Sequence, residues 1–270
     1  MFNIIKADLQ RVFRGKGIWI TLLIFLIFSF LSISSLLNTG DYSGGVDIGI
    51  NMNIEGDMIP VIPLEIVGIN TPLLMASNAD TILFLILPLI VFVASVDFSS
   101  GAVKNTLSNG VNRSNYYVVK LITTCTLSII IYALHIFIPT IAITIIRGFG
   151  GTFKELVNNS FGAFLGQLWL ILALTCIGVS LTFITKKTAL MNGLYTAFLI
   201  APLFILMLLI SINERFVSLV NYDFVVNFQA IASFPELPSE DIRRVFLLGL
   251  VYIVVSTASG IVLFRKAEIT

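Results

Sequence analysis

Charged side chains are scarce in this sequence, and their scarcity limits the classes of protein to which it can belong. Lys, Arg, Asp and Glu make up 11% of the 270 residues, whereas soluble domains carry about 25%. The mean hydropathy is +1.00, and 57% of the residues are hydrophobic. A net charge of +1 gives no general attraction to nucleic acid. The composition therefore predicts a polytopic membrane protein with no nucleic-acid partner.

Residues that perform catalysis or bind metals are equally rare. The only histidine is His135, so an H-E-x-x-H zinc site is excluded. The two cysteines, Cys125 and Cys176, lie in apolar runs and are typical of small buried hydrophobes rather than a disulfide. No G-x-x-x-x-G-K-[ST] phosphate loop occurs. We expect no metal site and no bound cofactor in this chain. An intramembrane enzyme that depends on His135 is the least favoured alternative.

Long hydrophobic runs dominate the sequence instead. A helix needs about 20 apolar residues to cross a bilayer core of about 30 Å. The sequence predicts one all-α membrane domain over residues 1–270, with six transmembrane helices. The expected spans are 18–37, 79–96, 119–146, 161–184, 189–212 and 245–264.

The charges in the connecting segments are segregated by sign. Six spans place both termini on one side, together with the connectors 97–118 and 185–188. That side carries eleven Lys and Arg and three Asp and Glu. The other side carries five Lys and Arg and twelve Asp and Glu. Because cations in short loops favour the cytoplasmic side, we expect both termini to be cytoplasmic.

The first 16 residues predict an amphipathic helix that lies in the inner membrane interface. Apolar residues recur at three- and four-residue spacing, and basic residues occupy much of the remainder. A basic flank that orients the first span is a compatible alternative. The residues that we assign to this interfacial helix are Phe2, Ile5, Leu9, Arg11, Phe13 and Arg14.

Two long connectors lie on the opposite side. Residues 38–78 are acidic and too polar to span a membrane. Residues 213–244 contain an apolar stretch at 224–234 that is too short for a span. We therefore predict short re-entrant or interfacial helices in this last outer loop.

Three polar residues lie inside the predicted spans. Polar groups at membrane depth either form hydrogen bonds between helices or line a transport pathway. Both alternatives apply to His135, Gln167 and Asn192.

The most polar segment between two spans is 97–120, "DFSSGAVKNTLSNGVNRSNYYVVK". Gly101 and Gly110 favour turns, and they bracket a stretch in which Val103 and Leu107 share one helical face. This pattern predicts a short amphipathic helix in a cytoplasmic loop. Such a helix either lies on the lipid surface or docks into a groove of a soluble partner.

This segment resembles the first cytoplasmic loop of ABC-2 type permeases, the membrane subunits of many ABC exporters. The resemblance rests on Asp97 at the end of the second span and on "GAVKNTLS", "GVNR" and "YYVVK". It also covers the layout of the whole chain, and small permeases of the lantibiotic-immunity, bacitracin-resistance or peptide-exporter type are the most similar in size. The implied ATPase-coupling residues are Asp97, Gly101, Lys104, Asn105, Leu107, Ser108, Gly110 and Arg113.

The resemblance implies partners and a cargo. Two permease subunits, identical or homologous, pair in a bacterial cytoplasmic membrane, and two soluble ABC ATPase subunits dock beneath them and bind ATP and Mg²⁺. The chain is then not an enzyme by itself. The implied cargo is an amphipathic peptide (an antimicrobial peptide or peptide toxin) or a hydrophobic drug, exported from the cell or from the membrane. The residues alone also allow a membrane anchor, channel or assembly factor.

The resemblance also implies an outer gate segment in the last outer loop. This segment contains Phe224, Phe228 and Phe234.

Overall fold

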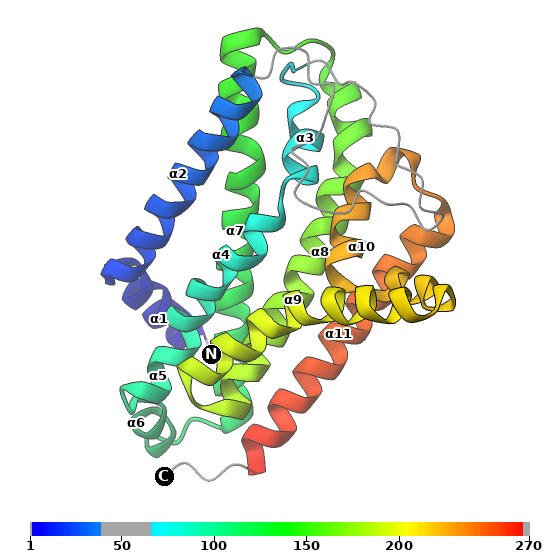
Figure 1. Cartoon of the computed structure of the whole chain (residues 1–270). Helices are drawn as coiled ribbons and strands as arrows, with labels where there is room; N and C mark the ends of the chain where they lie inside the picture. The colour runs from blue at the N-terminus through cyan, green and yellow to red at the C-terminus, as the bar shows by residue number, and fades with distance from the viewer. Residues whose placement is uncertain (1, 39–65, 267–270) are drawn as a thin grey trace.

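The computed structural model describes residues 2–38 and 66–266, and within these two ranges every regular element is a helix. Six helical segments are long and apolar enough to cross a membrane, which confirms the predicted all-α, six-span architecture (Figure 1). They are α2 (Lys16–Asn38), α4 with η1 and α5 (Asp80–Ser99), α7 (Arg113–Arg147), α8 (Phe153–Thr185), α9 (Thr188–Ile212) and α11 (Ser239–Lys266).

Two spans begin earlier than their apolar runs because polar caps extend them. The helix α7 begins at Arg113 instead of 119, after Asn112, whose side chain accepts a hydrogen bond from the Ser114 N–H at 2.9 Å. The helix α8 begins at Phe153 instead of 161, after a capping box in which Thr152 and Glu155 satisfy each other's backbone N–H. At 35 and 33 residues, both helices exceed the length that a bilayer requires.

The bundle is built around α8. About two thirds of its apolar window is buried, because α7 and α11 pack along it and α4 lies against it. The helix α9 differs: it diverges from the bundle in Figure 1, and only 11% of its apolar window is buried. Its main anchor is Tyr195, whose hydroxyl donates to the Leu83 carbonyl at 2.6 Å.

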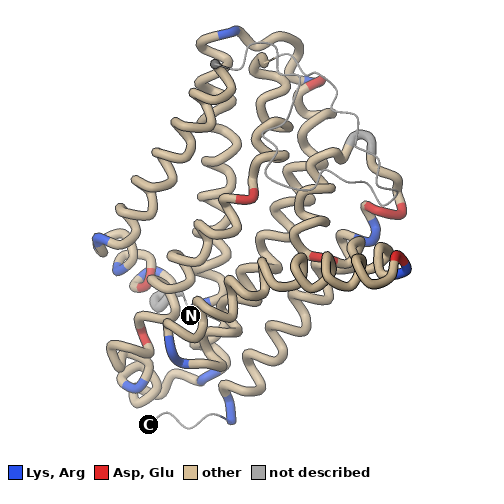
Figure 2. The backbone as a smooth tube through the Cα atoms, viewed as in Figure 1, with Lys and Arg blue, Asp and Glu red and all other residues tan. Residues whose placement is uncertain are grey.

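The two ends of the bundle differ in charge. Figure 2 shows Lys and Arg gathered at the end that holds the termini, as the segregation of charges in the sequence predicts. We call this end the basic end. It carries α1 (Phe2–Arg14), α6 (Ala102–Ser108), the α8–α9 turn and the last turn of α11. The helix α3 (Thr71–Ser77) and the α7–α8 turn lie at the opposite end, which we name the outer end after the predicted topology.

The last outer loop folds as three short helices between α9 and α11. They are η2 (Glu214–Tyr222), α10 (Phe224–Ala230) and η3 (Ile231–Glu236). Short helices were expected in this loop, and the apolar stretch 224–234 falls on α10 and η3, with non-helical angles at Ser233. Two glycines of α8, Gly162 and Gly166, lie one turn apart where η3 packs. A Cβ on either would collide with Phe234 or Ile231.

The first helix forms as predicted, and its inward face holds part of the predicted apolar face together with one acidic residue. Asp8 and Val12 point into the bundle and are buried, at 7% and 5% exposure. Ile5, Leu9 and Phe13 line an open apolar groove on the outer side of α1. The Phe2 side chain and residues 39–65, most of the acidic connector, lie outside the described part of the chain.

A hydrogen bond fixes the joint between α1 and α2. The Trp19 indole N–H donates to the Phe13 carbonyl at 2.9 Å, across the break at Gly15. The orientation of α1 is therefore fixed relative to the first span.

Candidate functional site

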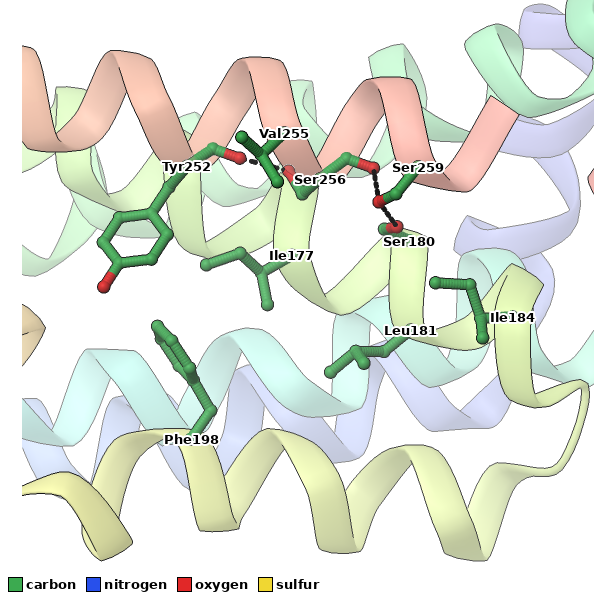
Figure 3. A pocket seen from close by; sticks show the side chains of 9 residues that line it. All are labelled: Ile177, Ser180, Leu181, Ile184, Phe198, Tyr252, Val255, Ser256 and Ser259. Carbon is green, nitrogen blue, oxygen red and sulfur yellow. Dashed lines mark hydrogen bonds between the residues drawn. The ribbon is translucent and has the colours of Figure 1, made fainter. Parts of the chain in front are cut away.

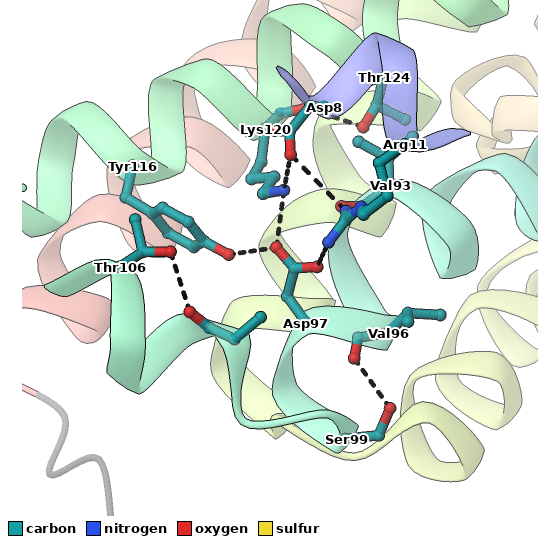
Figure 4. A network of polar contacts seen from close by, with 11 residues as sticks. Asp8, Arg11, Val93, Val96, Asp97, Ser99, Thr106, Tyr116, Lys120 and Thr124 are labelled. Carbon is teal, nitrogen blue, oxygen red and sulfur yellow. Dashed lines mark hydrogen bonds and ion pairs between the residues drawn. The ribbon is translucent and has the colours of Figure 1, made fainter. Parts of the chain in front are cut away.

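The strongest candidate site is a cluster of polar and charged side chains near the basic end, all of which are buried except Arg11, whose side chain is 40% exposed. It comprises Asp8 and Arg11 from α1, Asp97 from α5 (Val96–Ser99), and Tyr116 and Lys120 from α7 (Figure 4). We call this set the ion cluster. Two anions and two cations balance in charge, and balance of this kind is what permits charged groups in an apolar interior.

Lys120 lies at the centre of the ion cluster. Its Nζ is 2.7 Å from Asp8 Oδ1 and 2.6 Å from Asp97 Oδ2, and the side chain is 1% exposed. Removing an ammonium group from water costs several kcal/mol unless the geometry of its partners is good. The two carboxylates therefore hold α1 and α5 against α7.

Asp97 contacts three other side chains of the ion cluster. Its Oδ1 pairs with Arg11 Nη1, and its Oδ2 accepts a hydrogen bond from the Tyr116 hydroxyl in addition to the contact with Lys120. The residue is 2% exposed. A single buried carboxylate therefore joins three helices.

The backbone before Asp97 has an unusual helical turn. The helix α4 (Asp80–Ile90) contains Pro88, which lacks an N–H, and the π-helix η1 (Val91–Ser95) follows it. The Val93 carbonyl in this wide turn accepts a hydrogen bond from Arg11 Nη2 at 3.2 Å. Single π-turns occur frequently at functional sites. Here the turn connects the span directly to α1.

The predicted amphipathic helix is present as α6, beside the ion cluster. Gly101 and Gly110 have φ of 72° and 84°, a backbone region that favours glycine, and they form the turns on either side. Val103 is 1% exposed and packs into the bundle. Leu107 is half-buried on the same inner side. The exposed polar side chains of α6 are Lys104, Asn105 and Ser108.

Arg113 has a different place from the other predicted coupling residues. Its Nη1 donates to the Arg265 carbonyl at 2.9 Å, which ties the start of α7 to the end of α11. Among the predicted coupling residues, the structure therefore places Asp97 in the buried ion cluster, Arg113 at a helix junction and the remainder on or around α6.

A group of aromatic rings packs beside the ion cluster, against Tyr116. Phe98 lies 5.2 Å from Phe183, which lies 4.9 Å from Tyr117 and 4.7 Å from Phe264, each distance between ring centroids in edge-to-face geometry. Such pairs contribute about 0.5–1.5 kcal/mol beyond their buried area. They connect α5, α7, α8 and α11 in one packed layer.

The polar residues predicted within the spans lie elsewhere. Gln167 is completely buried, and its Nε2 donates to the Ala76 carbonyl at 2.8 Å and the Phe228 carbonyl at 3.0 Å. Its Oε1 accepts from the Tyr132 hydroxyl at 2.8 Å. Of the two predicted roles, these contacts match hydrogen bonding between helices. They hold α3 and α10 against α8.

The other two polar residues do not join that group. The His135 ring lies 6.4 Å from the Phe25 ring, and within the described chain its Nε2 has no hydrogen-bond partner. Asn192 is half-buried on α9. Within the described ranges, no group of three or more His, Cys, Asp or Glu side chains could hold a metal ion.

The predicted gate aromatics pack into the protein. Phe224 is 2% exposed, and its ring lies 5.7 Å from those of Phe198 and Tyr252. Phe228 is completely buried, and Phe234 packs against α8. These contacts close the outer loop against the bundle.

A cavity of about 240 Å³ between α8, α9 and α11 has little polar chemistry to offer (Figure 3). Its serines are already bonded, since Ser256 and Ser259 donate to carbonyls of α11 and Ser180 lies 3.4 Å from the Ser259 hydroxyl. No charged side chain among the described residues lines this cavity, so it offers no ionic contact that would select a ligand.

Sequence reasoning missed three members of the ion cluster: Asp8, Tyr116 and Lys120. A local signal existed, because Tyr116 and Lys120 are four residues apart and share one helical face, as Asp8 and Arg11 do at three. From the sequence, Asp8 and Lys120 indicated sidedness, and Tyr116 and Lys120 contributed to the family resemblance. Lys120 lies near the start of α7 on the same helical face as Tyr116. This placement was the sequence signal that Lys120 pairs with an acidic residue inside the bundle.

Comparisons with known proteins leave the function to be argued from this geometry. No protein-family model matches the sequence, and no curated protein matches it. The proposal below therefore rests on α6, the ion cluster and the distribution of charge.

Proposed function

We propose that the chain is the membrane-spanning permease subunit of an ATP-driven exporter of the ABC-2 type. The observation that carries the proposal is α6, a short helix held between two glycine turns beside the ion cluster. It presents Lys104, Asn105 and Ser108 outward at the basic end and buries Val103 behind them. A helix with one polar, accessible face and a firm inner anchor suits docking of a soluble partner.

The ion cluster supports a route for motion from α6 into the spans. Asp97 lies on α5, the helix before α6, and is paired with Arg11 on α1 and Lys120 on α7. Separating these groups would leave a buried charge unpaired, which costs about 3–5 kcal/mol. The three helices therefore move together when α6 is displaced, and the aromatic layer extends the movement to α8 and α11.

The remaining parts of the proposal follow from charge and resemblance. The basic end faces the cytoplasm, and the apolar groove of α1 faces the membrane interface. Two permease subunits, identical or homologous, pair in a bacterial cytoplasmic membrane above two ATPase subunits that bind ATP and Mg²⁺. The cargo is an amphipathic peptide or a hydrophobic drug. The α10 and η3 helices form the outer gate.

Co-purification tests the proposal. The tagged chain is extracted from its native membranes in a mild detergent, and soluble proteins that remain bound are identified and assayed for ATP hydrolysis. We expect an ABC ATPase that is active in the complex. The absence of any ATPase would contradict the proposal and favour a membrane anchor, channel or assembly factor.

A charge-reversed pair locates the docking surface. Lys104→Glu on α6 should reduce the amount of bound ATPase roughly ten-fold, because reversal of an interfacial charge opposes association. Lys154→Glu, an equally exposed change at the outer end, serves as the control and should retain the complex. An unchanged complex with unchanged ATPase activity in Lys104→Glu would show that α6 is not the docking element.

A further inference from the structure

A second cavity lies between α4, α9 and α10. It has a volume of about 270 Å³, and nine of its eleven lining residues are apolar, among them Phe84, Leu203 and Phe204. The two polar residues are Asp80 and Gln229. We call this cavity the Asp80 crevice.

No cation of the described chain pairs with the carboxyl group of Asp80. Its Oδ2 accepts a hydrogen bond from Gln229 Nε2 at 2.7 Å. Its Oδ1 is shielded from solvent and has no hydrogen-bond partner among the described residues, and none of the described ion pairs includes Asp80. A carboxylate in apolar surroundings is unfavourable without a cation. The crevice therefore has a place for one.

Two other sites in the protein show why this one is distinctive. In the ion cluster, the Asp8 Oδ2 atom also lacks a hydrogen bond, but Lys120 balances the charge of that carboxylate. In the cavity of Figure 3, the polar side chains are three serines and Tyr252, none of which carries a charge. Of these three sites, only the Asp80 crevice combines an apolar wall with a carboxyl group that no described cation contacts.

We propose that the Asp80 crevice binds an amphiphile with a single amino group. The ammonium group lies against the Asp80 carboxylate, and the apolar body lies along Leu203 and Phe204 of α9. The apolar wall continues onto the surface, where Phe204 and Met207 are 63% and 48% exposed. A ligand longer than the cavity therefore extends along α9. Anions are disfavoured because they would meet Asp80 directly.

This inference deepens the proposed function. Only the statement that the ligand is transported cargo rests on the proposed function. Binding itself requires no ATPase. The full chain can therefore be tested alone, and failure of one proposal leaves the other standing.

The test uses two probes that differ in charge. Dansylcadaverine carries an ammonium group on a five-carbon chain and a ring whose fluorescence rises in apolar surroundings, and its N-acetyl derivative is neutral. Each is titrated into the purified chain in phosphatidylcholine nanodiscs, with empty nanodiscs as the blank. We expect saturable binding of dansylcadaverine and at least about ten-fold weaker binding of the neutral derivative.

Three variants complete the test. Asp80→Asn should weaken dansylcadaverine about ten-fold and leave the neutral probe unchanged. Asp241→Asn, which removes a carboxylate paired with Arg244 outside the crevice, should change neither. Leu203→Trp, which fills the crevice, should weaken both probes, and it serves as the second variant if Asp80→Asn does not fold.

The outcomes that overturn the proposal are direct. Equal affinity of the two probes for the unchanged chain, or the absence of saturable binding, would show that Asp80 does not select a cation. Unchanged dansylcadaverine affinity in a folded Asp80→Asn variant would show the same.

Discussion

At the scale of single residues, Lys120 shows how the chain retains charge inside an apolar bundle. It is the only Lys or Arg that is buried in the described part of the chain, and it contacts two carboxylates that lie far apart in the sequence. A buried ion pair is weak evidence of stability by itself, but removal of one partner is costly. The arrangement therefore makes a sharp mutational prediction.

We expect Lys120→Met to lower the free energy of unfolding by about 3–5 kcal/mol, because two buried carboxylates then share only Arg11. Thermal unfolding in detergent measures the change. Lys104→Met, the same substitution on the exposed face of α6, is the control and should not alter the melting temperature.

A double variant separates charge from packing. Lys120→Met combined with Asp8→Asn restores a balanced pair of Arg11 and Asp97, so it should be more stable than Lys120→Met alone. If the double variant is less stable, the loss in Lys120→Met comes from packing and not from unpaired charge.

We expect the contribution of Asp223 to the free energy of unfolding to depend on pH. Burial raises the pKa of this carboxyl above its ordinary value of 3.8, although backbone N–H groups at the start of α10 lower it in part. The folded protein therefore binds this proton more tightly than the unfolded chain does. Ionisation of Asp223 costs stability above the raised pKa, and the cost disappears as the pH falls through 3.8.

Asp223→Asn removes the charge and keeps a side-chain oxygen that caps α10. We expect this variant to be more stable than the unchanged chain at pH 7, by a margin that shrinks to nothing near pH 4. Melting temperatures from pH 4 to pH 8 measure the margin. A margin that grows on acidification would contradict the assigned direction of the pKa shift.

At the scale of elements, the contact between η3 and α8 depends on the absence of side chains. Gly162 and Gly166 leave space that Phe234 and Ile231 occupy. Glycine costs about 0.5–1 kcal/mol in a helix relative to alanine. That cost is offset here by the close approach of the outer loop.

Gly166→Ala should therefore destabilise the protein despite its better helix propensity, because the added Cβ meets Ile231. Gly193→Ala in α9 is the matched control, since a Cβ at that position meets nothing within 4 Å. We expect a lower melting temperature for the first and an equal or higher one for the second. Equal effects of both substitutions on the melting temperature would show that η3 moves away from the added Cβ without loss of stability.

The elements also show which parts of the structure a single sequence can predict. Apolar runs located all six spans, because length and hydropathy are local properties. Gly101 and Gly110 correctly located the ends of α6, since both adopt positive φ. The helices α7 and α8 begin before the apolar runs from which their spans were predicted, because caps such as Asn112 and Thr152 extend a helix beyond its apolar run.

The ion cluster was only half predictable. Asp97 and Arg11 were both candidates, yet they were assigned to separate sites, and the pair is 86 residues apart in the sequence. No periodicity connects residues across such a distance. Charges near the ends of spans indicate sidedness, and only the packing of α1 against η1 and α7 shows that some of them face inward.

At the scale of the whole molecule, the two ends of the bundle carry different chemistry. The basic end holds α1 and α6, and the outer end holds α3 and the α7–α8 turn. The helix α7 connects them and, at 35 residues and about 1.5 Å per residue, is long enough to cross the membrane. The orientation of the chain can therefore be measured from one residue at each end.

We expect Ser108→Cys and Lys154→Cys to react with a membrane-impermeant maleimide from opposite sides of sealed vesicles, since both positions are exposed and lie at opposite ends of α7. Cys125 and Cys176 are first replaced by alanine. Our topology predicts that the reagent labels position 108 in inside-out vesicles and position 154 in right-side-out vesicles. Labelling of both positions from one side would contradict the six-span arrangement.

The hydrogen bond that joins Trp19 to α1 has a practical consequence. The chain contains only one other tryptophan, Trp169, whose indole donates to the Phe246 carbonyl at 3.1 Å. Trp169→Phe therefore leaves a single indole in the protein, located at the joint beside the ion cluster. Its emission wavelength and lifetime would report movement of α1 in the intact chain, without any attached dye.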